Sequence, residues 1–156
     1  MAGSAVIVSL RVRASPERAF AGFTQQIGDW WQTNSLFRIT SSKSERLELE
    51  PGPGGKLVAH MADGRSFTVG SISVWEPGAR LVLGWRHESF SEDQVTELEV
   101  RFEPVGDETR ITVEHRGWDA IPVEHVARHG FPLMLLQRRQ AEYWQSLLAR
   151  LATALG

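Results

Sequence analysis

Cysteine is absent from this chain of 156 residues. Disulfide bonds, catalysis by a thiolate and cysteine-ligated metal sites are therefore excluded. Long hydrophobic runs are also missing, because no apolar segment approaches the roughly 18 residues of a membrane-spanning helix. The first residues run into an alternating strand pattern without the basic segment of a signal peptide. We therefore expect no membrane insertion and a cytoplasmic location.

Neither sign of charge dominates the sequence. It holds 17 basic and 19 acidic residues, which gives a formal net charge of -2 at pH 7. Nearly all of the basic residues are arginines, and they are scattered rather than clustered. Since a nucleic-acid-binding protein usually shows a basic face, we expect no nucleic-acid partner.

Familiar catalytic motifs are missing as well. No Gly-x-Ser-x-Gly elbow, Walker loop or helix-opening Gly-x-Gly-x-x-Gly occurs. The glycine-rich residues 51–55 precede an expected strand, so no helix N-terminus is available there to hold a phosphate. The acidic residues at 45–50 and 97–103 are interpreted as solvated strand faces. The sequence predicts no catalytic residue and no cofactor; whether the chain is an enzyme stays open, with a non-enzymatic role favoured.

What the sequence does contain is a long series of strand patterns. Residues 96–102 are the clearest, because apolar and charged side chains alternate strictly there. Further candidates, which bring the number of strands to about seven, are residues 6–12, 46–50, 56–61, 67–75, 81–87 and 109–115. Asp63-Gly64 predicts a hairpin turn, and Gly70 is a candidate bulge.

Two helices are expected beside these strands. Ser15-Pro16-Glu17 is a typical helix start, with Ser15 as the cap and Pro16 at the first helical position. The second helix runs from Pro132 to about Leu155, with apolar residues at spacings of three and four. At about 1.5 Å per residue it is roughly 36 Å long. We interpret residues 1–156 as one α+β domain, a curved antiparallel sheet wrapped around a long C-terminal helix.

Two histidines share strand faces with expected core residues. His87 has the parity of Leu83 and Trp85, and His115 has that of Val113. If the registers hold, both imidazoles point into the space between sheet and helix, where each needs a hydrogen-bond partner. With a pKa near neutrality, either can serve as an acid or base. The alternative is that both lie half exposed at strand ends.

Another pair, His125 and His129, lies four residues apart. On a helix this spacing places two imidazoles on one face, as in many metal sites. The segment lacks the glutamate that follows the first histidine of a metalloprotease helix, and no third ligand is evident. We interpret both as exposed histidines and predict no metal site.

Several local sequences occur in an order that is typical of one family. They cover nearly the whole chain and comprise residues 13–20, 29–31, 51–55, 70–85, 109–112 and 117–118. With these segments the chain resembles the activator-of-Hsp90-ATPase-like (AHSA1-like) group of the START/Bet v 1-like (SRPBCC) helix-grip superfamily, which also includes polyketide cyclases. The resemblance implies a highly curved sheet gripping the C-terminal helix, with a pocket between them.

The resemblance says less about activity, because one fold hosts many functions. Residues 119–130 lie where relatives vary widely. Single-domain members also lack the additional domain expected of the eukaryotic chaperone regulator that gives the group its name. We therefore expect no Hsp90 interaction.

Three functions remain as hypotheses. The first is binding of a small, largely apolar molecule between sheet and helix, driven by apolar burial at roughly 25 cal/mol per Å². The second is an enzyme of the polyketide cyclase or hydrolase kind that uses a pocket histidine. The third is a chaperone-associated protein-interaction domain with a filled core, which an exposed apolar patch around Leu36 and Phe37 would favour. The oligomeric state stays open, with a homodimer as one alternative.

The candidate ligand-binding residues are those expected to line the pocket. Aromatic side chains supply flat apolar walls, and tryptophan adds one N–H donor. The family layout places five of the six tryptophans next to the groove. The predicted set is Trp30, Trp31, Phe37, Leu83, Trp85, His87, Val100, Val113, His115, Trp118, Leu136 and Trp144.

Overall fold

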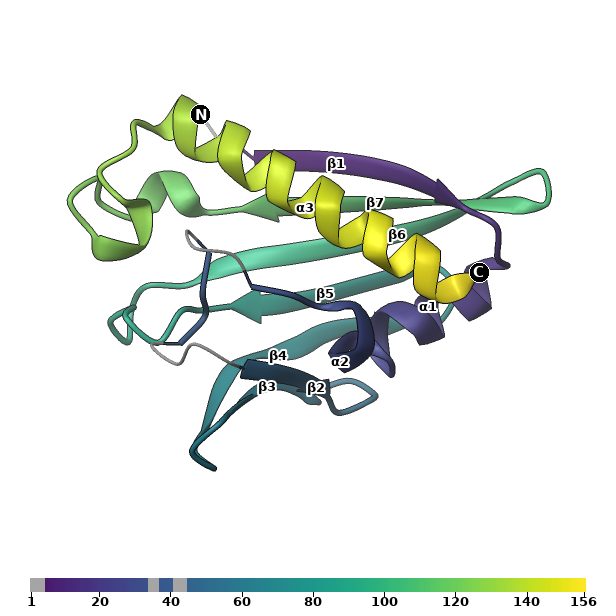
Figure 1. Ribbon diagram of the computed structural model, residues 1–156, viewed down its shortest axis with the longest axis horizontal. Helices are drawn as coiled ribbons and strands as arrows, with labels where there is room; N and C mark the ends of the chain where they lie inside the picture. The colour runs from purple at the N-terminus through teal and green to yellow at the C-terminus, as the bar shows by residue number, and fades with distance from the viewer. Residues whose placement is uncertain (1–4, 34–36, 41–44) are drawn as a thin grey trace.

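The computed structural model describes residues 5–33, 37–40 and 45–156. Strands and helices follow one another as an N-terminal strand and two short helices, six further strands, two short 3-10 turns and a long terminal helix (Figure 1). Their bounds are β1 Ala5–Val12, α1 Pro16–Thr24, α2 Ile27–Trp30, β2 Glu45–Leu49, β3 Lys56–Met61, β4 Ser66–Glu76, β5 Arg80–Trp85, β6 Thr96–Val105, β7 Glu108–Arg116, η1 Trp118–Ala120, η2 Val126–Arg128 and α3 Leu133–Leu155.

All seven strands belong to one antiparallel sheet with the order β1-β7-β6-β5-β4-β3-β2. The strand register places the buried residues of the alternating patterns opposite one another on neighbouring strands. Val113 of β7 pairs with Val8 on one side and with Val100 on the other, and Val100 pairs with Leu81. All four side chains are buried, so this row forms part of the apolar face that α3 covers.

The sheet is curled because β4 changes register twice. One shift lies between Leu57 and Val58 of β3, opposite Gly70, and the second lies between Ile72 and Val74. Gly70 is required at the first bend, because a Cβ there would lie 1.9 Å from the carbonyl oxygen of Gly84. The candidate bulge is confirmed. Bulges increase strand bending and twist, and here they turn the sheet around the terminal helix.

Helix α3 crosses the concave side of the sheet diagonally, and its C-terminal end reaches α1 (Figure 1). Its buried stripe consists of Leu136, Gln140, Trp144, Leu147, Leu148, Leu151 and Leu155. Ser15 caps α1 by accepting a hydrogen bond from the backbone N–H of Arg18 at 3.2 Å. The Arg18 guanidinium in turn donates to the carbonyl of Leu155, at the last turn of α3. These contacts fix one end of α3 and leave its other half to border the site.

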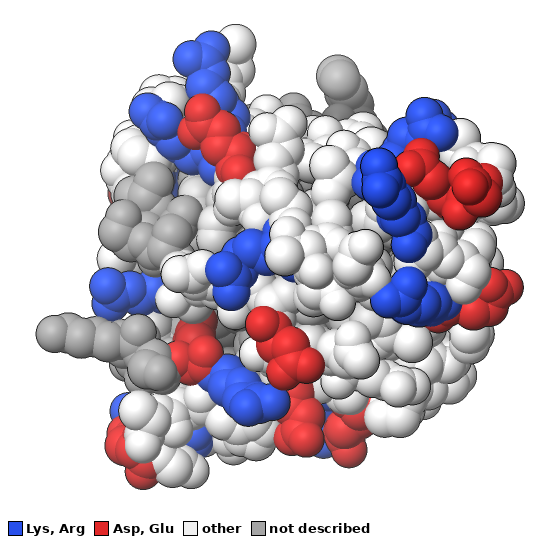
Figure 2. All heavy atoms as spheres, turned by 45° about the vertical axis from the view of Figure 1, so that its right-hand side comes forward, with Lys and Arg blue, Asp and Glu red and all other residues white. Residues whose placement is uncertain are grey.

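The convex side of the central strands carries a lattice of ion pairs. Arg116 contacts Glu97 at 2.5 Å, Glu99 at 2.9 Å and Glu114 at 2.9 Å, while Arg80 contacts Glu99 at 2.8 Å. Burial acts to raise the pKa of Glu99, but its bonds to Arg80 and Arg116 outweigh burial and lower it. Glu99 is only 8% exposed, so the expectation that this acidic face is solvated is wrong at Glu99. Elsewhere basic and acidic side chains stand side by side (Figure 2).

The predicted α+β architecture with seven strands and a long terminal helix is confirmed. β5 ends earlier than expected, at Trp85, so His87 lies in the following loop. Among the described residues, no helix is long and apolar enough to cross a membrane. Leu36, named in the interaction-patch hypothesis, lies outside the described residues, whereas its neighbour Phe37 is buried.

Candidate functional site

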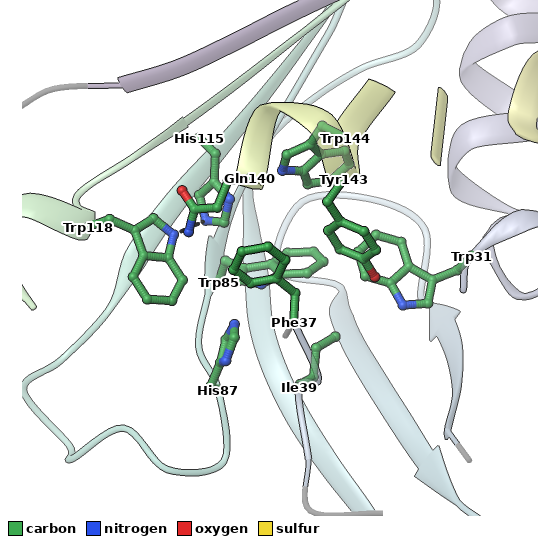
Figure 3. Close-up of a pocket in the computed structure, with 10 residues that line it drawn as sticks. All are labelled: Trp31, Phe37, Ile39, Trp85, His87, His115, Trp118, Gln140, Tyr143 and Trp144. Carbon is green, nitrogen blue, oxygen red and sulfur yellow. Dashed lines mark hydrogen bonds between the residues drawn. The ribbon is translucent and has the colours of Figure 1, made fainter. Parts of the chain in front are cut away.

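A cavity lies between the N-terminal half of α3 and the ends of β5 and β7. Its lining comes from α3, from the sheet, from the α2–β2 connection and from the turn after β7, as Figure 3 shows. The residues are Trp31, Phe37, Ile39, Trp85, His87, His115, Trp118, Gln140, Tyr143 and Trp144. The pocket expected between sheet and helix is therefore present.

The free space inside this cavity is small. Only about 20 Å³ of the space between the lining atoms admits the centre of a water molecule. This value is the one that limits a guest, and a single water needs roughly 10–15 Å³ by this measure. The cavity as it stands has room for about one water, so a larger guest requires lining side chains to move.

Aromatic rings form most of the walls. The indoles of Trp31, Trp85 and Trp144 pack against one another with centroid distances of 5.3, 5.7 and 6.1 Å. Phe37 lies against Tyr143 at 5.4 Å. Tilted and edge-to-face contacts at these distances are favourable. The walls offer flat apolar surface on several sides of the central space.

One ring nitrogen of His115 has two polar neighbours that compete for it. Its Nε2 lies 2.8 Å from Thr96 Oγ1 and 3.3 Å from the Trp118 indole nitrogen, whose N–H points at it. Thr96 also donates to the carbonyl of Trp85 at 2.7 Å. Because a hydroxyl has one proton and a neutral ring nitrogen either donates or accepts, these three contacts cannot all be hydrogen bonds at once. The tautomer of His115 therefore decides whether the Trp118 N–H is available to a guest.

His87 has no such partner. Its ring stacks on Phe90 at 5.1 Å with an interplanar angle of 10°, and Trp118 meets its edge at 5.3 Å. Within the described part of the chain, no hydrogen bond to either ring nitrogen of His87 is present, although the residue is only 6% exposed. In Figure 3 the ring points toward the space between the aromatic walls, with a nitrogen at its tip.

Both histidines are held neutral at pH 7. Burial, with smaller effects from the charges of His125 and His129, lowers the pKa of His87 to about 4. Burial, followed by the charges of His87 and Arg116, lowers the pKa of His115 to about 3. A neutral imidazole presents one N–H and one lone pair. These rings therefore act in the cavity as uncharged hydrogen-bonding groups.

Two more polar atoms of the lining are buried without a partner among the described residues. They are the side-chain oxygen of Gln140 and the indole N–H of Trp31. Gln140 is 3% exposed and sits one turn from both Leu136 and Trp144 on the buried stripe of α3. A glutamine at a stripe position is the sequence signal that would have revealed it.

Sequence reasoning also missed Tyr143 and Ile39. The Tyr143 hydroxyl donates to the carbonyl of Gln32 at 2.5 Å, and burial, followed by the charge of Glu45, raises its pKa above the ordinary value. Tyr143 neighbours Trp144 on the helix, outside the apolar stripe. Ile39 lies in a segment without strand or helix, and no periodic pattern marks it.

The predicted site residues fall into three groups. Those that line the cavity are Trp31, Phe37, Trp85, His87, His115, Trp118 and Trp144. Leu83 lines a smaller apolar cavity that shares Trp31, Trp85 and Trp144 with the first. Trp30, Val100, Val113 and Leu136 are buried and line neither of these two cavities. A ligand-binding role stays a prediction for the whole set.

The segment with His125 and His129 does not form the helix considered from the sequence. Val126–Arg128 is a 3-10 turn, and His129 has a left-handed backbone with φ of 54°. His125 Nδ1 accepts from the backbone N–H of Ala127 at 3.1 Å, so its Nε2–H donates to the carbonyl of Ser89 at 3.1 Å. His125 is thus half-buried and engaged on both nitrogens. The described residues contain no cluster of three or more metal-ligating side chains.

A curled antiparallel sheet that grips a long terminal helix, with an aromatic cavity between them, defines a protein of the SRPBCC, or helix-grip, type. Residues 13–156 match the family model of the Activator of Hsp90 ATPase homolog 1-like protein. The chain belongs to this AHSA1-like family. A search among curated proteins finds no match.

Several solved structures have the same fold. The Bacillus halodurans protein BH1534 has a TM-score of 0.70 and 15% identity, with 100% of both chains covered. PFC0360w, described as an HSP90 activator from Plasmodium falciparum, has a TM-score of 0.64 and 19% identity, covering 99% of this chain and 97% of that one. The anthrahydroquino-γ-pyrone synthase Txn09, in a complex, has a TM-score of 0.58 and 27% identity, with 97% of both chains covered.

Proposed function

We propose that this protein binds a small, largely apolar aromatic molecule between its sheet and α3. The observation that carries the proposal is the cavity itself: three indoles packed around a space that also contains buried polar atoms without partners. Domains of the SRPBCC type typically bind small ligands.

The buried polar groups support this proposal on energetic grounds. Leaving a buried donor or acceptor unpaired costs about 1–3 kcal/mol, and most such groups in folded proteins are paired. The Gln140 side-chain oxygen and the Trp31 indole N–H belong to residues that line this cavity, and both are buried without a partner among the described residues. A guest, or a water that a guest replaces, would supply the missing bonds.

A guest must open the cavity before it can bind. The free space is limited to about 20 Å³, and Phe37 packs on Tyr143 at one wall. When only a fraction of molecules is open, the apparent affinity falls by that fraction. Tight binding therefore needs large apolar contact with the indoles, which burial at roughly 25 cal/mol per Å² provides.

Native mass spectrometry of freshly purified protein, compared with the same sample after denaturation, tests the proposal directly. We expect a small molecule that is lost only on denaturation and whose mass identifies the ligand. The spectra also count the subunits. If the native mass equals that of the bare chain and uncharged aromatic probes do not bind in solution, the proposal is wrong.

Filling the cavity should weaken binding. Ile39→Phe adds volume to a space with room for about one water, so we expect affinity for the uncharged fluorescent probe N-phenyl-1-naphthylamine to fall at least about tenfold. The matched control is Ile7→Phe, on the edge strand β1, where the residue is 59% exposed. Fluorescence titration gives both affinities, and thermal unfolding verifies the fold. Equal loss in both variants, or in neither, would contradict the cavity as the binding site.

A second candidate function is an enzyme of the polyketide cyclase kind. Txn09, which is 27% identical over 97% of both chains, is named as a synthase of an aromatic pyrone. His115, in contact with Thr96, and His87 are neutral imidazoles that line the cavity, where each can hydrogen-bond a reacting carbonyl or hydroxyl of a polyketide. The test is conversion of an aromatic polyketide with an uncyclised side chain. His115→Gln and His87→Gln should then lose conversion while retaining binding, and no conversion by the unmodified protein would dismiss this candidate.

A further inference from the structure

We propose that the ligand is an uncharged aromatic alcohol, a phenol in the simplest case, whose hydroxyl is buried beside Gln140 and Trp118. This inference rests on the proposed function, because it names the class of molecule that the same cavity accepts. It is carried by the arrangement of the polar atoms of the lining.

The unpartnered oxygen of Gln140 lies at one end of the cavity. Figure 3 shows Gln140 beside His115 and Trp118 there, whereas Trp31 and Tyr143 lie at the opposite end, where the Tyr143 hydroxyl already donates to Gln32. Between the two ends the lining consists mostly of aromatic rings, so a guest that reaches Gln140 is apolar over most of its length and polar at that end. The indoles of Trp85 and Trp144 lie along the apolar part, which favours a flat ring system.

The polar end of the guest must donate a hydrogen bond. The side-chain oxygen of Gln140 is buried without a partner in the described structure, and an amide oxygen only accepts. An ether or ketone would place a second acceptor against it and leave both unpaired. A hydroxyl or an N–H is required.

The polar group of the guest must also be able to accept a hydrogen bond. The Trp118 indole N–H competes with Thr96 for one nitrogen of His115. When His115 donates to Thr96, the Trp118 N–H needs an acceptor from elsewhere. A hydroxyl donates one hydrogen bond and accepts others at its lone pairs. It can therefore donate to the Gln140 oxygen and accept from the Trp118 N–H.

A charged guest is excluded by the lining. None of the described residues that line the cavity is lysine, arginine, aspartate or glutamate. Arg116 is engaged with Glu97, Glu99 and Glu114 on the convex face, and the buried Arg128 donates to the carbonyls of Ile121 and Phe131. A buried carboxylate or ammonium without a counter-charge is strongly unfavourable. The ligand class is therefore neutral.

Four naphthalenes of nearly equal size test this inference by displacement of N-phenyl-1-naphthylamine at pH 7.5. They are 2-naphthol, 2-methoxynaphthalene, naphthalene and 2-naphthoate. We expect 2-naphthol to bind about tenfold tighter than the methoxy compound and naphthalene. 2-Naphthoate should bind at least about a hundredfold more weakly than 2-naphthol.

The variant Gln140→Leu tests whether Gln140 is the residue that makes 2-naphthol bind more tightly than naphthalene. Gln140→Leu keeps the bulk of the side chain and removes the acceptor, so 2-naphthol should lose its tenfold advantage while naphthalene binds as before. Gln145→Leu, at an exposed position of the same helix, should retain the full advantage. The binding of naphthalene shows in each case that the cavity has kept its shape.

The outcomes separate the two proposals. If neither N-phenyl-1-naphthylamine nor any of the four compounds binds, the proposed function is wrong and this inference falls with it. If the probe binds and 2-naphthol does not displace it, the proposed function stands and this inference is wrong. If naphthalene or 2-methoxynaphthalene binds as tightly as 2-naphthol, the apolar site stands and the hydroxyl assignment is overturned. If the advantage of 2-naphthol survives in Gln140→Leu, the hydroxyl is not recognised by Gln140, and the inference is wrong in that form.

Discussion

We expect the free energy of unfolding to fall by about 4 kcal/mol between pH 7.5 and pH 5, about 2 kcal/mol for each of two histidines. In the folded protein the pKa is about 4 for His87 and about 3 for His115, below the ordinary value of 6.5. At pH values between the folded-state pKa and 6.5, the two histidines are protonated in the unfolded chain but not in the folded protein. Stability is therefore complete above about pH 6.5 and declines as the pH falls toward 4.

Urea denaturation at the two pH values measures this effect. His87→Phe preserves the aromatic packing on Phe90 and removes one titrating ring, so it should reduce the pH dependence by about half. His60→Gln is the control, because it removes an exposed imidazole on β3. Carboxyl groups with a lowered pKa, such as Glu99, change the free energy of unfolding only at lower pH, where they begin to take up protons. A free energy that is flat from pH 7.5 to pH 5 would refute the assignment of neutral, buried rings.

Gly70→Ala should destabilise the protein by more than about 3 kcal/mol or prevent folding altogether. Its Cβ would lie 1.9 Å from the carbonyl oxygen and 2.5 Å from the carbonyl carbon of Gly84. Both are backbone atoms, so the clash is relieved only if β4 and β5 separate. Because β5 carries Trp85 into the cavity, probe binding should weaken as well.

Gly84→Ala is the matched control on the facing strand. A Cβ at Gly84 meets only Val95 Cγ2, at 3.6 Å, which is an ordinary contact. We expect its free energy of unfolding to stay within about 1 kcal/mol of the unmodified protein. Denaturation of both variants under the same conditions decides the matter, since equal stabilities would mean that the close approach at Gly70 does not define the bend.

The fold could be predicted because its signals are local and periodic. Alternation defines strands such as Thr96–Val105, and the stripe from Leu136 to Leu155 defines α3. The curvature is a different matter: Gly70 suggested a bulge, but only the second register shift, near Ile72, reveals how far β4 bends. That shift depends on pairing with β5, and nothing in the local sequence encodes it.

The site could be predicted only in part. Strand parity placed His115 correctly, since β7 continues through it. The same argument predicted that His87 faces the cavity, although β5 ends at Trp85 and His87 is not part of the strand. The prediction holds because the ring of His87 stays buried in the loop after the strand. Gln140 was missed because a search for apolar spacing passes over a polar residue in the stripe. The free volume depends on how side chains pack against one another, and periodicity carries no information about that.

The three packed indoles also have an optical consequence. Transition dipoles of chromophores 5.3 to 6.1 Å apart couple strongly, so Trp31, Trp85 and Trp144 absorb as a group rather than singly. Such a group gives paired circular-dichroism bands of opposite sign, whose strength depends on the relative orientation of the rings. Any molecule that moves between the rings changes this signal, so the protein contains its own spectroscopic reporter of occupancy.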